Sequence, residues 1–326
     1  MECSICGATA VYEVKYNGSA LCKNHFIAYV EKRVKREIRE QVDFGNKKTR
    51  ISVAISGGKD SSATLYLLHK ILSERRNLEL TAFTVDEGIE GYRSTGLEKA
   101  KKLCDNLGIE HNVISYKENY GYSLDEIMKI DKKTISCSHC GPMRRQLMNR
   151  ISEYTESDYV ALGINLDDYA QSILMNVAKG DVARYARMAP HSYTREGLVP
   201  RILPLRKIPE KEVVLYAILN GIDFDSSWCP YYSMAQRNSF RDIIEKLEKE
   251  TPGTKFAIVK FFDETRKSIR EHYVNENVKL NSCKICGAPT PGEICEVFFS
   301  GAIFLALNLP SYRNGGPSLR NVPHLP

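Results

Sequence analysis

A short glycine-containing segment that follows an apolar run is the sequence feature that most limits which fold this chain can adopt. The run is Ile51–Ile55, and the residues Ser-Gly-Gly-Lys-Asp-Ser-Ser follow it at 56–62. Glycine lets the backbone approach a ligand closely, and the first N–H groups of a following helix have no partners within that helix. This strand, loop and helix therefore predict a phosphate-binding loop. It is not the ordinary P-loop, because Asp60 follows Lys59 where that motif has Ser or Thr.

Composition limits the classes of protein to which the chain can belong. With 326 residues, 43% of them hydrophobic and 26% charged, it can form one large domain with small appendages or two domains. No apolar run reaches the roughly 18 residues of a membrane span. The N-terminus lacks the basic and apolar regions of a secretory signal, so we expect a cytoplasmic protein. Ten cysteines in such a chain indicate metal or sulfur chemistry rather than disulfide bonds.

Apolar, β-branched segments of strand length alternate with helix patterns in the middle of the chain. This alternation predicts an α/β fold with a parallel sheet covered by helices on both faces. Ligands of such sheets bind beyond the carboxyl ends of the strands, where the loops that contain Ser56, Asp86 and Gly163 should meet. The predicted strands are 51–55, 79–85, 111–115 and 159–163, and the predicted helices are 61–73, 94–107, 144–154, 167–178, 239–250 and 255–270.

The chain divides into five predicted segments. These are a zinc module at 1–25, a basic linker helix at 26–48, the α/β domain at 49–230, a helical extension at 231–280, and a second cysteine cluster with a tail at 281–326. Several lysines and arginines of the linker helix would share one face. Such a face can neutralise nucleic-acid phosphates, but a basic stripe interleaved with glutamates is also a common solvated surface. The pattern leaves both interpretations open.

Two cysteine clusters have the spacing of metal ligands. Cys3 and Cys6, then Cys22 and His25, form two pairs whose spacing predicts a closed tetrahedral zinc site. The C-terminal cluster supplies only Cys283, Cys286 and Cys295, because Phe298 stands where a second pair would be completed. His272 or His324 could add the fourth ligand, so this second zinc site is either intact or damaged.

A third group of cysteines lies within the α/β domain. Cys137 and Cys140 form one pair, and Cys229 follows in a Trp-Cys-Pro sequence. Three thiolates can store sulfur as a persulfide, or they can hold a 4Fe–4S cluster that leaves one iron open. Spacing alone also allows Cys229 to be a buried apolar residue, and Cys104 fits simple packing on an apolar helix face.

Together these residues resemble the cytoplasmic tRNA 2-thiolation family, whose PP-loop ATPase domain has the adenine nucleotide alpha hydrolase-like fold. The resemblance extends over residues 1 to about 295. Within it, the CPY, RRQ and PGTKF segments are closer to the archaeal and eukaryotic wobble-uridine branch than to the T-loop branch. The matching segments are SGGKDS at 56–61, DEGIEGYR at 86–93, CSHCGPMRRQ at 137–146, GINLDDYAQSILMN at 163–176, GDVARYARM at 180–188 and CPY at 229–231.

The resemblance implies a role for each matched residue. Asp168 would act near the reacting centre or hold Mg²⁺, and Arg144 falls where the family has a basic active-site residue. Cys137, Cys140 and Cys229 match the family's catalytic cysteines, which ligate a 4Fe–4S cluster in archaeal-type members. The residues expected to bind ATP are Ala54, Ser56, Gly57, Gly58, Lys59, Asp60, Ser61, Asp86, Gly163 and Asp168, and Asp60 is also expected to take part in catalysis.

The chain departs from the family pattern at several positions. Ile164 and Tyr169 replace a usual His and Glu, so any role of those side chains is absent. The tail after Cys295 does not resemble the family, which indicates a divergent ending and a damaged second zinc site.

The resemblance implies an ATP-dependent tRNA-uridine 2-sulfurtransferase that acts on the wobble base. Its expected cofactors are ATP, Mg²⁺, a 4Fe–4S cluster and Zn²⁺. Its expected partners are tRNA, a second copy of the chain, and a sulfur donor, which could be sulfide, a persulfide carrier or a ubiquitin-like thiocarboxylate. Two alternatives stay open. The adenylating core could instead serve thiolation of the T-loop uridine or of a cytidine, or amidation of a small acid. Alternatively, the chain could be a zinc-ribbon RNA-binding adaptor with a vestigial nucleotide site.

Overall fold

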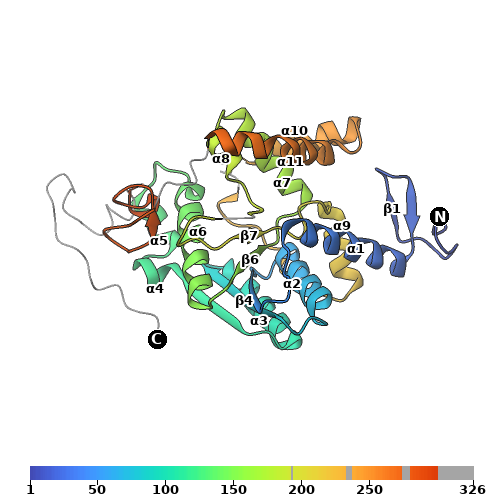
Figure 1. Ribbon diagram of the computed structural model, residues 1–326, viewed down its shortest axis with the longest axis horizontal. Helices are drawn as coiled ribbons and strands as arrows, with labels where there is room; N and C mark the ends of the chain where they lie inside the picture. The colour runs from blue at the N-terminus through green and yellow to red at the C-terminus, as the bar shows by residue number, and fades with distance from the viewer. Residues whose placement is uncertain (192–193, 233–236, 274–279, 300–326) are drawn as a thin grey trace.

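A five-stranded parallel sheet forms the centre of the protein. The computed structural model describes residues 1–191, 194–232, 237–273 and 280–299 (Figure 1). The strand order is β5-β4-β3-β6-β7, and every pairing is parallel, which confirms the predicted fold class. The strands are β3 (Thr49–Ala54), β4 (Leu78–Asp86), β5 (His111–Ser115), β6 (Tyr159–Leu162) and β7 (Arg201–Ile202).

Helices cover both faces of this sheet, because its central strands are apolar on both sides. Ile51 and Val53 of β3 belong to one hydrophobic cluster, while Phe83 and Val85 of β4 belong to another on the opposite face. The first cluster includes side chains from α1 (Lys23–Gln41), α2 (Lys59–Leu72), α3 (Arg93–Leu107) and α9 (Glu210–Leu219). The second includes side chains from α4 (Tyr116–Tyr120), α5 (Leu124–Ile130) and α6 (Ser136–Tyr154).

A third hydrophobic cluster joins helices beside the sheet. Tyr169 packs its ring edge-to-face on Phe262, with ring centroids 5.5 Å apart, and Tyr185 packs on the same ring at 4.9 Å. Figure 1 shows α10 and α11 above α7 and next to α8. Tyr169 therefore has a packing role at the position where the family usually carries Glu. The helices are α7 (Leu166–Ala178), α8 (Val182–Ala186), α10 (Arg237–Glu250) and α11 (Thr254–Tyr273).

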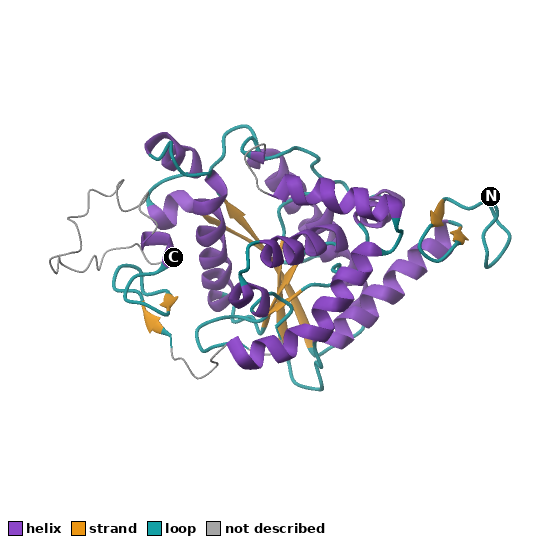
Figure 2. Cartoon of the chain, turned by 90° about the horizontal axis from the view of Figure 1, so that it is seen from above, coloured by secondary structure: helices purple, strands orange, loops and turns teal. Residues whose placement is uncertain are grey.

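Two small cysteine-containing modules lie at opposite ends of the molecule (Figures 1 and 2). The N-terminal module is the hairpin of β1 (Tyr12–Val14) and β2 (Ser19–Leu21), which leads into α1. The C-terminal module contains β8 (Asn281–Ser282), β9 (Pro289–Thr290) and α12 (Glu296–Phe299), and it packs on α6. In the described part of the chain, no helix has the length and apolar character needed to cross a membrane.

The prediction that a helix begins at Arg144 was wrong. Helix α6 begins at Ser136, eight residues earlier, and contains Pro142. Proline removes one helix hydrogen bond, which usually ends a helix pattern. Here His139 and Met143 are buried next to Pro142, so tertiary packing keeps the segment helical. As a result Cys137 and Cys140 lie on a helix, not in a loop. The predicted tail beyond residue 299 lies outside the described residues.

Candidate active site

The predicted phosphate loop joins the end of β3 to the start of α2. Gly58 is the N-cap of α2, and no side chain caps the first turn, so the first amides of this helix stay available to an anion. Ser61 Oγ accepts a hydrogen bond from Ser56 N at 3.0 Å and lies 3.0 Å from Ser56 Oγ. These contacts hold the loop in a closed turn around the helix N-terminus.

Two glycines of the site are required by close backbone contacts. Gly57 has a φ of 80°, and a Cβ there would lie 1.9 Å from the carbonyl oxygen of Gly96 in α3. A Cβ on Gly163 would lie 2.8 Å from backbone atoms of Asp60 and Ser61. The end of β6 therefore packs directly against the first turn of α2. The contact with Gly96 was not predicted, because nothing local marks a helix glycine as a neighbour of this loop.

Lys59 has two acidic neighbours at the start of α2. Its Nζ atom lies 2.8 Å from Oδ2 of Asp60 and 2.8 Å from Oε1 of Glu210. Burial lowers the pKa of Lys59, but the two carboxylates outweigh burial and raise the pKa above its ordinary value. Lys59 is thus a fixed positive charge beside the loop. Glu210, the first residue of α9, was not singled out in the sequence because its neighbours lie far away along the chain.

Asn165 connects the start of α7 to the phosphate loop. Its Nδ2 atom donates to Oδ1 of Asp60 at 2.9 Å, and its Oδ1 caps α7 by accepting from the amide of Asp168 at 2.9 Å. Burial raises the pKa of Asp168, and Arg237 of α10 approaches its carboxylate at 3.4 Å. The structure therefore brings the carboxylates of Asp60 and Asp168 to the same rim.

Two other predicted ATP-binding residues lie at strand ends. Ala54 ends β3 and is half-buried. Asp86 ends β4, and its Oδ1 accepts a hydrogen bond from Gly88 N at 2.8 Å, so this carboxylate stabilises its own turn.

A buried glutamate connects the phosphate loop to the cysteine pair. Oε1 of Glu87 lies 2.7 Å from Nη2 of Arg144, and its Oε2 pairs with Arg93. Arg93 Nη1 donates to the Ser56 carbonyl at 3.4 Å, while Arg144 Nη2 donates to Cys140 Sγ at 3.2 Å. A continuous series of contacts therefore runs from the loop to Cys140. The sequence placed the loop that contains Glu87 at this rim but assigned a role only to Asp86, because only the fold brings the partners of Glu87 together.

Cys229 reaches the same rim through the segment that follows α9. Asp225 N donates to the Gly57 carbonyl at 2.8 Å, so this segment passes alongside the phosphate loop. Cys140 and Cys229 pack against the same hydrophobic cluster. Burial raises the pKa of Cys229, and the nearby thiols of Cys140 and Cys137 raise it further. The three thiols do not form one of the tight ligand groups found among the described residues, whose atoms lie within 4.8 Å of one another.

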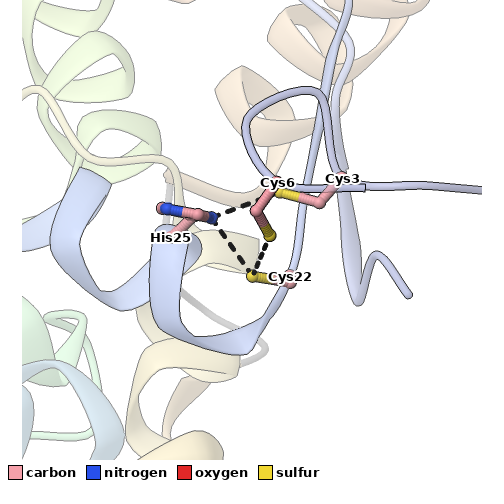
Figure 3. A group of neighbouring side chains, drawn as sticks. All are labelled: Cys3, Cys6, Cys22 and His25. Atoms are coloured by element: carbon pink, nitrogen blue, oxygen red, sulfur yellow. Dashed lines mark hydrogen bonds between the residues drawn. The ribbon is translucent and has the colours of Figure 1, made fainter. Parts of the chain in front are cut away.

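The N-terminal cysteines and histidine form such a tight group. Figure 3 shows His25 directed toward the sulfurs from the first turns of α1. Its Nδ1 atom lies 3.3 Å from Cys22 Sγ and 3.4 Å from Cys3 Sγ, and Cys6 Sγ is 3.8 Å from Cys22 Sγ. Four ligand atoms of the N and S type that gather around one point fit a single tetrahedral ion.

The C-terminal cysteines form the second tight group, with three members. Cys283, Cys286 and Cys295 all lie within 4.8 Å of one another, and no His, Asp or Glu of the described residues joins them. His272 is therefore not a ligand in this arrangement, and His324 lies outside the described residues. Phe298 is buried and packs near Tyr120, with ring centroids 6.3 Å apart.

The basic residues of the linker helix α1 fall into two groups, one with a structural role and one that is exposed. Arg33 Nη1 lies 2.6 Å from Glu212 and donates to Tyr16 at 2.7 Å, so this arginine holds α1 on α9. Other cations of α1 stay exposed along a shallow groove of about 430 Å³. The groove is lined by Tyr29, Lys32, Arg33, Lys35, Arg36 and Arg39.

An exposed aromatic group lies next to Cys229. Trp228 is 61% exposed, and its ring meets that of Tyr232 with centroids 4.6 Å apart. The guanidinium of Arg241 lies over both rings, 5.5 Å from the Trp228 centroid. A ring that is fixed on one side and open on the other can stack on a nucleobase.

Comparison with known proteins gives matches over nearly the whole chain. A PP-loop domain model matches residues 29–247, and a model for the N-terminal LIM domain of the 2-thiouridine synthetase TtuA matches residues 2–27. The tRNA 2-thiolation protein NcsA of Haloferax volcanii is 36% identical over 90% of this chain and 96% of its own length. The tRNA-5-methyluridine(54) 2-sulfurtransferase of Pyrococcus horikoshii is 32% identical over 90% of this chain and 92% of its own.

A solved structure matches as well. The U34-tRNA thiolase NcsA from Methanococcus maripaludis, with its [4Fe-4S] cluster, superposes with a TM-score of 0.79 at 36% identity, covering 92% of this chain and 95% of that one. The PP-loop match and these relatives agree with the phosphate loop, the cysteines and the zinc-type module described above. The chain therefore belongs to the PP-loop family of tRNA 2-thiolation sulfurtransferases.

Proposed function

We propose that this protein converts a tRNA uridine, at the wobble position, into 2-thiouridine with consumption of ATP. The observation that supports this most is the series of contacts Ser56–Arg93–Glu87–Arg144–Cys140, which connects the phosphate loop with a cysteine. A nucleotide-activated base and a sulfur nucleophile must meet in such a reaction. One rim that carries both groups meets this requirement.

The reaction has two chemical steps. The C2 oxygen of uracil attacks the α-phosphorus of ATP, and pyrophosphate leaves. Hydrosulfide then attacks C2, and the C2–oxygen bond breaks to release AMP. Lys59 and the free amides of α2 would stabilise the charge on the departing pyrophosphate. Asp60 and Asp168 would hold Mg²⁺, because carboxylate oxygens are the ligands that this ion prefers.

Three cysteines fit an iron–sulfur cluster in this site. The thiols of Cys140 and Cys137 both raise the pKa of Cys229, the three lack the tight spacing of a single-ion group, and a cluster binds each thiolate through a different iron. Such a cluster would keep one iron without a protein ligand, which supplies a place for hydrosulfide. Arg144 donates to Cys140, and its Nε atom has no hydrogen-bond partner in the described part of the chain.

Features outside the rim support RNA as the substrate. The exposed cations of α1 can contact phosphates, and Trp228 can stack on an unpaired base beside Cys229. The N-terminal group of Cys3, Cys6, Cys22 and His25 would hold zinc and so stabilise a module too small to fold through its core alone. A homodimer, a cytoplasmic location and the nature of the sulfur donor stay predictions from the family resemblance.

The test combines a thiolation assay with position mapping. Protein reconstituted without oxygen is incubated with tRNA, ATP, Mg²⁺ and sulfide, and the modified nucleotide is located by mass spectrometry. We expect one 2-thiouridine, at position 34. Sulfur at position 54 would favour the T-loop alternative. Position 54 is the one in the name of the Pyrococcus relative. Absence of any thiolated base, with ATP and cluster bound, would refute the proposal.

Variants separate the two halves of the site. Lys59→Ala should abolish ATP cleavage to AMP, which a mere RNA-binding adaptor would not need. Alanine at Cys137, Cys140 or Cys229 should remove the brown chromophore of the anaerobic protein. Cys104→Ala is the matched control, because this cysteine lies on α3 and is buried in the core, and the variant should keep both chromophore and activity.

A further inference from the structure

Among the described residues, the C-terminal thiol group lacks a fourth ligand from its own module. Structural zinc sites are almost always four-coordinate, and here Cys283, Cys286 and Cys295 supply three sulfurs. Phe298 occupies the position that would complete a second pair, and its buried ring packs toward Tyr120. Within the described part of the chain, a fourth ligand would therefore have to come from another element.

Gln146 of α6 reaches the thiols. Its side-chain amide places one terminal atom, assigned as Nε2, 3.2 Å from Cys286 Sγ and 3.6 Å from Cys295 Sγ. The other terminal atom, assigned as Oε1, lies 2.8 Å from the hydroxyl of Tyr120. The carboxamide thus lies between the thiol group and a buried tyrosine.

The hydrogen bonds of Tyr120 decide which end of this amide faces the sulfurs. The Tyr120 hydroxyl lies 3.2 Å from the Met143 carbonyl, which can only accept. With Oε1 of Gln146 on its other side, the hydroxyl would have to donate to two acceptors with its one proton. The two ends of an amide are assigned from such networks, and a half-turn of the amide resolves the conflict. Its NH₂ group then donates to the Tyr120 oxygen, the Tyr120 proton goes to Met143, and the amide oxygen faces the thiols.

We propose that the carboxamide oxygen of Gln146 is the fourth ligand of a zinc ion held by Cys283, Cys286 and Cys295. Zinc binds thiolate sulfur and also oxygen donors, so three thiolates and this amide oxygen would complete the four-coordinate arrangement of a structural site. The proposal replaces the expectation of a damaged site. It does not rest on the thiolation activity.

This ligand set has a consequence for the active site. Gln146 lies six residues after Cys140 on the same helix, so the ion would fix α6 to the C-terminal module. Arg145 of α6 also forms an exposed ion pair with Glu296 of the C-terminal module, at 3.4 Å. Exposed pairs contribute little, so the metal would be the main connection besides apolar packing.

Metal analysis of the purified full-length protein tests the proposal. We expect two zinc ions per chain, besides iron, and one of them should become at least tenfold easier to remove with a chelator in Gln146→Leu. Gln146→Glu should keep two, because a carboxylate oxygen can ligate zinc. Arg145→Gln is the matched control on the neighbouring position, and its zinc content should match that of the wild type.

Each other outcome overturns the proposal in a distinct way. One zinc per chain in the wild type would mean that the three thiols hold no ion. An unchanged second zinc in Gln146→Leu would mean that position 146 is not a ligand. Loss of zinc in Gln146→Glu would indicate that the glutamine donates N–H groups to the sulfurs. Cobalt-substituted protein adds a direct readout, because the d–d absorption should shift between wild type and Gln146→Glu only if residue 146 binds the metal.

Discussion

Oε1 of Glu87 lies 2.7 Å from Nη2 of Arg144, and the glutamate is buried, with only 1% of its surface exposed. The carboxylate of Glu87 also pairs with Arg93, so one buried negative charge holds two arginines. It raises the pKa of Arg144 well above its ordinary value. Because Arg93 contacts the phosphate loop and Arg144 contacts Cys140, Glu87 fixes the relative position of the two halves of the site.

Glu87→Ala should destabilise the protein strongly. Removing one partner of a buried ion pair leaves uncompensated charge and typically costs about 3–5 kcal/mol. We expect the free energy of unfolding in urea to fall by about that amount. Glu90→Ala is the control, because this glutamate is exposed in the same loop and its loss should change stability by less than about 0.5 kcal/mol. Equal stability of the two variants would contradict a structural role for Glu87.

Gly163→Ala should impair nucleotide binding. The new Cβ would lie 2.8 Å from backbone atoms of Asp60 and Ser61, so the first turn of α2 must move. We expect ATP affinity to fall at least tenfold, which corresponds to a loss of about 1.4 kcal/mol of binding free energy. Gly292→Ala is the control, since its Cβ meets only Ile294 O at 3.8 Å. Calorimetric titration with ATP measures both, and unchanged affinity in Gly163→Ala would contradict the prediction.

Trp228 should report directly on RNA binding. It is the single tryptophan of the chain, so the intrinsic tryptophan fluorescence comes from this residue alone. We expect quenching by an anticodon stem-loop, because its 61% exposed ring can stack on a base. Trp228→Ala should weaken tRNA binding by about 1–3 kcal/mol, the usual contribution of one stacked base. Phe261→Ala, which removes a 59% exposed ring on α11, should leave affinity unchanged. No quenching at saturating RNA would exclude stacking on this residue.

His191 should make stability depend on pH between about 4 and 6.5. Burial, together with the positive charge of Arg201, lowers its pKa from 6.5 to about 4. The unfolded chain therefore takes up a proton at a higher pH than the folded protein does. The stabilising contribution is complete above pH 6.5 and is lost as the pH falls toward 4. His191→Asn should flatten this decline in urea unfolding measured across that range. Parallel curves for variant and wild type would exclude His191 as its source.

Local sequence patterns determined the central strands, the glycine loop and both groups of clustered thiols. These depend on interactions within a few residues: apolar runs of strand length, glycines before a helix, and cysteine pairs separated by two intervening residues. For that reason β3, β4, β5 and β6 lie within a residue or two of their predicted bounds. The start of α6 was mispredicted because Pro142 is a local breaker that burial of its neighbours overrides.

Tertiary structure alone decided which distant residues share a site. Glu87 meets Arg144 only because β4 and α6 are adjacent, and Glu210 meets Lys59 only because α9 packs on α2. Gln146 reaches the C-terminal thiols only where that module docks on α6. Charge pairing and ligand geometry depend on distance in space, and a sequence specifies distance only between near neighbours. The sequence therefore provided the reacting groups, and the packing of helices on the sheet provided their partners.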